Sequence, residues 1–233
     1  SALRCSVNSN PCCKNTNYVL GNVGPDAPFG ELPIEPDELA DPNSTGQIMQ
    51  FRVGPALAAD KSTPPQFLTL PSITPISVAN AKVRRLALLE NMSQYTDGPA
   101  EALLGTVVGD PTVGDPLDPT TWPMAEHKMW MEPVTENPQA GDTEIWEFYN
   151  ATADSHPMHI HDVFFQVVNR QPIFVDEMGH HVLIQPGSMP LQPEAWENGF
   201  KDTVIAYPGY VTRVKAKFVN SGQFVWHCHI VEH

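Results

Sequence analysis

Basic residues are scarce in this sequence of 233 residues. Its 13 lysines and arginines stand against 27 aspartates and glutamates, which gives a formal net charge of -14. Binding to nucleic acids or to anionic membranes needs a basic face that releases counterions or meets acidic headgroups. The charge therefore argues against nucleic acid and membrane partners, and it favours the solvated surface of an exported protein.

Long apolar runs are absent as well. No stretch approaches the roughly 18 apolar residues of a membrane-spanning helix. The first residues, Ser1 to Cys5, lack the apolar core of a secretion signal. We therefore expect any targeting peptide to lie outside this chain.

Cysteine is also infrequent, and the four cysteines fall into two populations. Cys5, Cys12 and Cys13 lie near the start, where one disulfide is plausible in an oxidising compartment. A bond between the adjacent Cys12 and Cys13 is the least favourable pairing because it would be strained. Cys228 stands apart, between two histidines.

Proline and glycine, in contrast, are frequent and spread along the chain, with 24 and 15 residues. They separate short apolar runs, which is typical of many short strands joined by turns. Long irregular stretches are predicted at 1–46 and 91–138, and the proline-rich segment 54–75 resembles an interdomain linker. The leucines of 81–90 would also suit a helix, but the turn signals around that segment favour a strand. Strands are predicted at 47–53, 81–90, 143–149, 163–168, 203–206, 211–219 and 223–226.

Several polar and sulfur-containing residues receive an ordinary structural interpretation. Met129 and Met131 could bind a soft metal near His127, but their alternation with Trp130 favours a strand packed in the core. His127 is interpreted as a surface residue. We interpret His180 and His181 as solvent-exposed, and Phe224 and Trp226 as packed in the core. Asp202 either orients nearby ligands or lies at a strand edge or turn. Glycosylation sequons are present at Asn43, Asn91 and Asn150.

Six of the nine histidines are concentrated in two short segments, 156–161 and 227–233, the second of which also contains Cys228. Such a set of imidazoles with one thiol indicates metal binding. Successive side chains of a strand point to opposite faces, so His227 and His229 should face one way and Cys228 the other. One strand can then serve two metal sites. His159 and His161 follow the same rule, whereas Pro157 breaks the pattern and allows His156 to point elsewhere.

A type 1 copper site needs two imidazoles and one thiolate, with a weak axial ligand. Cys228 supplies the thiolate. His233, five positions later, can fold back to the same metal, and His156 is the natural second imidazole.

The two segments resemble the C-terminal copper motifs of multicopper oxidases, His-Pro-x-His-x-His and His-Cys-His-x-x-x-His. The resemblance extends to 45–53, 133–136, 143–146 and 200–203. It is strongest to the branch of spore-coat laccases, bilirubin oxidases and phenoxazinone synthases, and it covers most of the chain.

This resemblance implies an all-β, cupredoxin-like fold, a Greek-key β-barrel. Residues 76–233 would be the third such domain, truncated after the type 1 histidine, and 1–75 the end of the second domain with its linker. The implied ligands are His156, Cys228 and His233 for type 1 copper, His159 for type 2, and His161, His227 and His229 for type 3.

The implied activity is that of an oxidase with four coppers per complete enzyme. Phenolic, tetrapyrrole or metal-ion donors would give single electrons to the type 1 copper. Electrons would pass through Cys228, flanked by His227 and His229, to a trinuclear cluster that reduces O2 to water. The implied location is secreted, periplasmic, or on a spore or cell surface.

The sequence departs from the family pattern at both ends. The axial methionine or leucine, expected five residues after the last histidine, and the acidic residue near it have no counterpart. Four further cluster histidines of a first domain are missing too. We therefore expect a C-terminal fragment that does not reduce O2 alone and whose partner is the missing N-terminal part, either in the same polypeptide or as a separate chain.

Other metal proteins account for fewer of these residues. A single-copper cupredoxin that carries electrons would use His156, Cys228 and His233 but has no use for the other histidines. A copper nitrite reductase needs no His-Cys-His element. Structural zinc is disfavoured because one thiolate among so many imidazoles is unusual for it.

Overall fold

The computed structural model describes residues 16–27, 29–30, 34–55, 57–59, 61–96 and 98–230. The disulfide predicted among Cys5, Cys12 and Cys13 and the copper ligand predicted at His233 concern residues outside these ranges. The chain divides into two compact units, Ser1–Ser72 and Ile73–His233. The interpretation of 1–75 and 76–233 as parts of two cupredoxin domains stays a prediction.

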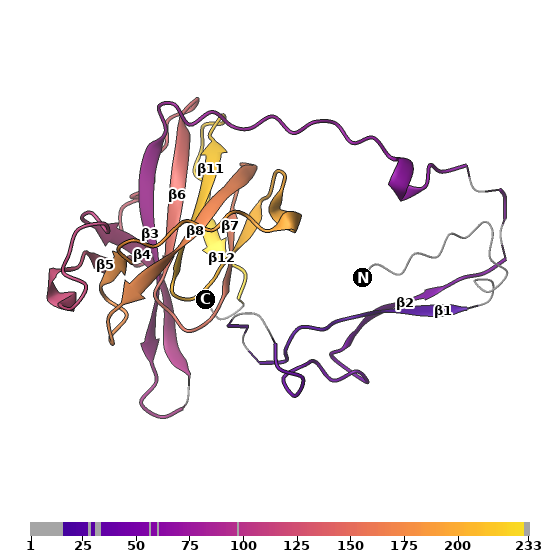
Figure 1. The fold of residues 1–233 in the computed structure, drawn as a ribbon, viewed down its shortest axis with the longest axis horizontal. Helices are drawn as coiled ribbons and strands as arrows, with labels where there is room; N and C mark the ends of the chain where they lie inside the picture. Colours follow the sequence, from indigo (N-terminus) through magenta and orange to yellow (C-terminus); the bar gives the residue numbers. More distant parts are fainter. Residues whose placement is uncertain are drawn as a thin grey trace. The chain divides into compact units, whose positions relative to one another are not determined.

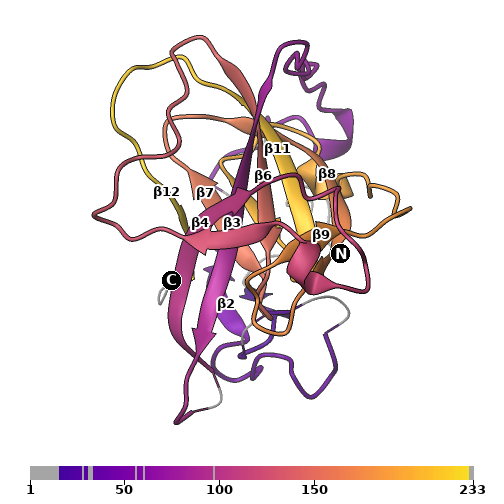
Figure 2. The ribbon, with the colours of Figure 1, turned by 90° about the vertical axis from the view of Figure 1, so that its left-hand side faces the viewer.

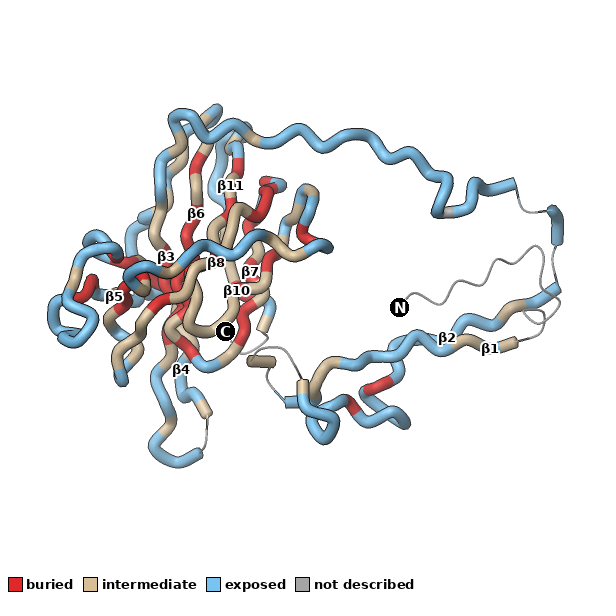
Figure 3. The backbone as a smooth tube through the Cα atoms, in the orientation of Figure 1, coloured by how far each residue is buried: buried red, intermediate tan, exposed pale blue. Residues whose placement is uncertain are grey.

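The described residues of the first unit form an antiparallel ribbon. Strands β1 (Asn17–Gly21) and β2 (Gln47–Arg52) pair with an irregularity between Leu20 and Gly21, and η2 (Pro65–Phe67) is a short 3-10 helix. The strand predicted at 47–53 is confirmed, and β1 was missed within the predicted irregular start. Every described residue of β2 is exposed, so this ribbon has little core of its own (Figure 3).

The second unit is built from two sheets (Figures 1 and 2). A seven-stranded sheet has the order β5-β4-β3-β6-β11-β8-β9, and a three-stranded sheet has the order β10-β7-β12. Strands β3 and β6 are parallel, and the other neighbouring pairs are antiparallel. The strands are β3 (Lys82–Met92), β4 (Pro99–Val108), β5 (Met124–His127), β6 (Thr143–Asn150), β7 (His156–Ile160), β8 (Phe165–Val175), β9 (Val182–Ile184), β10 (Thr203–Ala206), β11 (Tyr210–Lys217) and β12 (Trp226–Cys228).

The all-β prediction is confirmed. Among the described residues of the second unit, helical structure consists of the 3-10 turns η3 (Pro119–Thr121) and η4 (Ala195–Glu197). Within the described part of the chain, no helix has the length and apolar character needed to cross a membrane.

Strand β3 shows why the sequence was ambiguous there. Leu86 and Leu88 point into one apolar cluster, and Ala87 and Leu89 point into a second cluster on the opposite face. A strand covered on both faces is a continuous apolar run without alternation. The prediction of a strand is confirmed.

The core beside the candidate site lies between the two sheets. The three-stranded sheet contributes Met158, Ile160 and Cys228, and the seven-stranded sheet contributes Trp146 and Phe148 among others. Strand β11 buries Thr212, Val214 and Ala216 while Arg213, Lys215 and Lys217 are more exposed, which is the alternation of a strand with one wet face and confirms the strand predicted at 211–219. Val211 departs from it, because the second cluster covers that end of the strand.

The predicted irregular stretch 91–138 is wrong, since it contains β4 and β5. Gly105 lies in the middle of β4 and lowers the strand signal of the sequence. Its role is close approach, because a Cβ atom there would collide with the backbone oxygen of Glu126 on β5.

Two core predictions are also wrong. Met129 and Met131 are 57% and 89% exposed, because the chain leaves β5 at His127 and turns instead of continuing as a strand. Phe224 is 49% exposed, and the residues before Trp226 are not in a strand. Trp226 does pack against the core.

Candidate metal centre

Both histidine segments lie on neighbouring strands of the three-stranded sheet. Strand β7 is central and pairs with β12 so that His227 lies opposite His159 and Cys228 lies opposite Met158. Directly opposed residues of an antiparallel pair share a face, and successive residues alternate between faces. The two strands therefore present two different sets of side chains.

The side of the β7–β12 pair that carries Cys228 and His156, the sulfur side, faces the core. His156 and Cys228 are each only 4% exposed, and the burial of β7 alternates along its length. The structure places His156 on this side, away from His159, as the sequence suggested, but for a different reason: Pro157 lies within β7, so simple alternation directs His156 inward.

Cys228 and His156 make direct contact. The Sγ atom lies 3.4 Å from His156 Nδ1, and the backbone N–H of Ile230 donates to Sγ at 3.3 Å. Burial raises the pKa of the Cys228 thiol, against the opposing effect of the backbone N–H groups of Ile230 and His229. A coordinated metal reverses that balance by stabilising the thiolate. A thiolate beside an imidazole in an apolar site suits copper.

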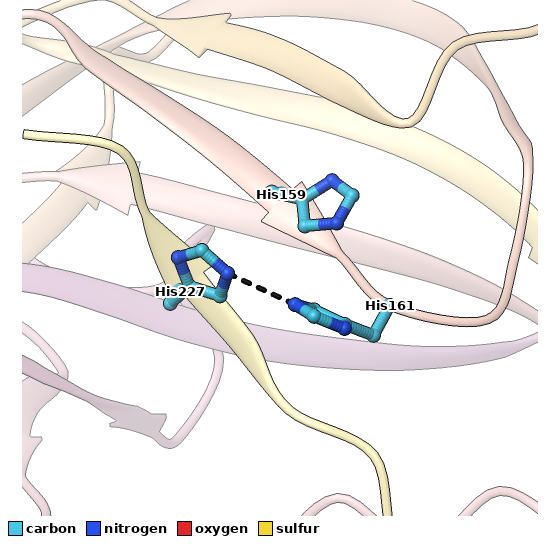
Figure 4. Close-up of side chains that lie close together, drawn as sticks. All are labelled: His159, His161 and His227. Atoms are coloured by element: carbon cyan, nitrogen blue, oxygen red, sulfur yellow. Dashed lines mark hydrogen bonds between the residues drawn. The ribbon is translucent and has the colours of Figure 1, made fainter.

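The opposite side, which carries His159, His161, His227 and His229 and is the imidazole side, faces outward. Candidate ligand atoms of His159, His161 and His227 all lie within 4.8 Å of one another (Figure 4). His161 Nε2 lies 3.0 Å from His227 Nε2, and the ring of His229 is 4.8 Å from that of His227. Partial desolvation and the nearby imidazoles lower the pKa of His161, which favours the neutral, ligand-competent ring.

Backbone carbonyls fix the orientation of two of these rings. His159 Nδ1 lies 2.6 Å from the carbonyl oxygen of Asp202, and His227 Nδ1 lies 2.9 Å from that of Cys228. A carbonyl only accepts, so each Nδ1 carries a proton, and in the neutral ring the lone pair for a metal is then on Nε2. Asp202 thus contacts His159 through its backbone carbonyl, and its carboxylate accepts from the Thr203 hydroxyl, which lies 3.3 Å from His159 Nδ1.

Trp226, the first residue of β12, is held by a hydrogen bond and by aromatic packing. Trp226 Nε1–H donates to Glu136 Oε2 at 3.2 Å, and the indole packs against Trp146 and Phe148 with ring centroids 6.0 and 5.9 Å apart. These contacts fix the strand that carries His227 and Cys228.

Two contributors to the site were missed from the sequence. Thr152 Oγ1 lies 2.7 Å from His156 Nε2, and Asn150 Oδ1 lies 2.8 Å from Thr152 Oγ1. The sequence signal for both residues is Asn150-Ala-Thr152, which we interpret from the sequence only as a glycosylation sequon. Asn-x-Thr can also form a local turn through side-chain hydrogen bonds to the backbone.

The remaining described histidines lie outside this arrangement. His127 and His180 are exposed, and His180 and His181 follow the predicted turn at Met178 and Gly179. His181 Nδ1 contacts Asp176 Oδ2 at 3.1 Å.

A β-domain with a thiol-imidazole pair on one face of a strand pair and an imidazole cluster on the other presents ligand types that suit copper. Residues 106–233 match the family described as multicopper oxidase. A laccase of Bacillus stratosphericus is 35% identical over 83% of this chain, and a laccase of Bacillus subtilis (strain 168) is 34% identical over 83%. A solved structure of a McoA multicopper oxidase variant (2F4) from Aquifex aeolicus covers 94% of the chain at 27% identity, with a TM-score of 0.51.

The chain belongs to the multicopper oxidase family, and its fold matches the cupredoxin-like domains of that family. Membership implies copper as the cofactor. The chain spans 34% and 33% of the two Bacillus laccases and 38% of the Aquifex structure, about a third of their lengths.

Proposed function

We propose that this chain carries the type 1 copper site and half of the trinuclear cluster of a laccase-like oxidase that reduces O2 to water. The observation that carries this proposal is the placement of Cys228 and His227 on opposite faces of one strand pair. A protein with one metal needs only one of these faces.

The type 1 site would be formed by His156, Cys228 and His233. The contact between Cys228 Sγ and His156 Nδ1 supports two of these ligands. Apolar neighbours on the sulfur side, among them Met158 and Phe148, would exclude water and tune the reduction potential.

The imidazole side would supply His159 to the type 2 copper, and His161, His227 and His229 to the type 3 pair. These four side chains are exposed or half-buried in this chain, which leaves room for further ligands. The missing four histidines would come from an N-terminal part of the enzyme, as one polypeptide or as a second chain. This chain alone would then be inactive in O2 reduction.

When bound, copper supplies the one-electron redox chemistry that connects an electron donor to O2. The protein supplies the connection between the sites, because the backbone joins Cys228 directly to His227 and His229. It also sets the proton positions, since the carbonyls of Asp202 and Cys228 hold protons on Nδ1 of His159 and His227.

The donors would be phenols, tetrapyrroles or metal ions, as in the branch of spore-coat laccases and bilirubin oxidases. Location outside the cytoplasm, at a spore or cell surface or in the periplasm, would suit such an enzyme. Oxygen uptake with one donor of each kind tests this part of the proposal.

The decisive experiment measures denatured mass and copper content on the same enzyme, purified from its source. Four coppers per complete enzyme and additional polypeptide carrying further histidines are expected. His227→Ala should lower the copper content, while His127→Ala, an exposed histidine outside the site, should leave it unchanged. One copper per enzyme and no effect of His227→Ala would contradict the proposal.

That contrary result would favour a single-copper electron carrier. The Cys228–His156 contact is the observation compatible with it. The clustering of His159, His161 and His227 within 4.8 Å disfavours it, because a carrier gains nothing from a second imidazole group.

A further inference from the structure

A buried chain of hydrogen bonds ends on His156. Asn150 is 0% exposed, Thr152 is 6% exposed and His156 is 4% exposed. Their polar side-chain atoms are linked in sequence, Asn150 Oδ1 to Thr152 Oγ1 at 2.8 Å and Thr152 Oγ1 to His156 Nε2 at 2.7 Å. Buried polar groups of this kind must satisfy one another, so each proton in the chain can be placed.

The amide of Asn150 has a fixed orientation. Its Nδ2 lies 2.7 Å from the carbonyl of Asp154 and 2.9 Å from that of Ala206, and both of these groups only accept. Its Oδ1 accepts from the backbone N–H of Thr152 at 2.9 Å, which only donates. Oδ1 is therefore the atom that faces the Thr152 hydroxyl.

The hydroxyl proton of Thr152 must consequently point away from His156. Its neighbours Asn150 Oδ1 and the Asp154 carbonyl, at 3.2 Å, are both acceptors, and the hydroxyl has one proton to give. The short contact to His156 is then a bond in which Nε2–H donates and Thr152 Oγ1 accepts. In a neutral imidazole, this leaves the lone pair on Nδ1, the atom beside Cys228 Sγ.

We infer that Thr152, held by Asn150, is a positioning residue that selects the metal-binding tautomer of His156. The inference rests on the proposed function, in which His156 binds the type 1 copper. Hydrogen bonding of the distal nitrogen also raises the basicity of a ligating histidine and keeps its ring in place. The Asn150-Ala-Thr152 sequence thus has a structural role at the copper site.

The first test reads the tautomer without metal. In [15N]histidine-labelled apo-protein, correlations between ring nitrogens and carbon-bound protons distinguish a protonated nitrogen from one with a lone pair, and His156→Gln assigns the signal. We expect the proton on Nε2. A proton on Nδ1 would overturn the inference, whether or not any variant folds.

The second test uses copper-loaded protein and the variants Thr152→Val and Thr152→Ser. Valine keeps the shape but removes the hydroxyl, so copper affinity at the thiolate site should fall about 10–100-fold and the blue absorption should move in wavelength. Serine should restore both. A valine variant with unchanged affinity and absorption would refute the role of Thr152. Absence of blue absorption in the unsubstituted protein would instead refute the proposed function and leave the tautomer result standing.

Discussion

Substitution of Arg170 should destabilise the domain that carries the metal ligands. Its guanidinium donates to both carboxylate oxygens of Glu197, at 2.7 and 2.5 Å, and to the carbonyl of Ile205 at 2.8 Å. The two side chains are only 5% and 6% exposed. The hydrogen bonds of Arg170 thereby connect β8 to β10, the strand that lies beside His159.

The expected cost follows from burial. Removing one partner of a buried pair leaves the other charge uncompensated, which costs about 3–5 kcal/mol. Arg170→Met should lower the free energy of unfolding by that amount. The double variant with Glu197→Gln should cost at least about 2 kcal/mol less than the sum of the single variants. Arg52→Met, at an exposed position, should change stability by no more than about 0.5 kcal/mol.

The effect should depend on pH. Burial alone would raise the pKa of Glu197, but hydrogen bonds from Arg170 and from the Glu194 backbone, with the positive charge of Arg170, lower it below its ordinary value of 4.5. A carboxyl group whose pKa is lower in the folded than in the unfolded protein stabilises the fold at pH values above its unfolded pKa. This stabilisation is lost as the pH falls through the folded pKa. The difference between unsubstituted protein and Arg170→Met should therefore shrink below about pH 4.5.

Denaturant unfolding of the five proteins (unsubstituted, Arg170→Met, Glu197→Gln, the double variant and Arg52→Met) between pH 3 and 7 provides the assay. The denaturant midpoints are compared where the slope of the transition is unchanged. A loss below about 1 kcal/mol for Arg170→Met, or a loss that is the same at every pH, would refute this reasoning.

Three further predictions concern packing and modification. Phe148→Ala should lower the free energy of unfolding by about 3–5 kcal/mol, because the ring is fully buried in the core between the sheets; denaturant unfolding measures this, and a loss under about 1 kcal/mol would contradict it. Gly105→Ala should cost about 1–3 kcal/mol because of its contact with the β5 backbone, whereas Gly98→Ala, with nothing nearby, should cost less; equal costs would contradict the packing. In a glycosylating host, peptide mass spectrometry should find Asn150 unmodified, because it is fully buried, while Asn43 and Asn91 are exposed; a glycan on Asn150 of folded protein would be incompatible with this fold.

Much of the site could be predicted because it depends on local geometry. Alternation along a strand places Cys228 opposite to His227 in any sheet, so the two faces followed from sequence alone. The sequence also predicted that His156 points away from His159 and His161, although Pro157 does not interrupt β7 as expected.

The parts that could not be predicted depend on tertiary contacts. Gly105 in β4 lowers the strand signal although the close approach of β5 requires it, and Met129 and Met131 alternate like strand residues although the chain turns there. The carbonyl of Asp202 reaches His159 only because β10 pairs with β7. The Asn150-x-Thr152 spacing is compatible with a local turn, but it does not specify the contact of Thr152 Oγ1 with His156.

The separation of two metal sites by one strand pair is the central claim, and Cys228→Ser in copper-loaded enzyme tests it most directly. Removal of the sulfur should abolish the blue absorption, while electron paramagnetic resonance still detects copper held by imidazoles on the other face. Simultaneous loss of both signals in a folded variant, or survival of the blue absorption, would contradict the account.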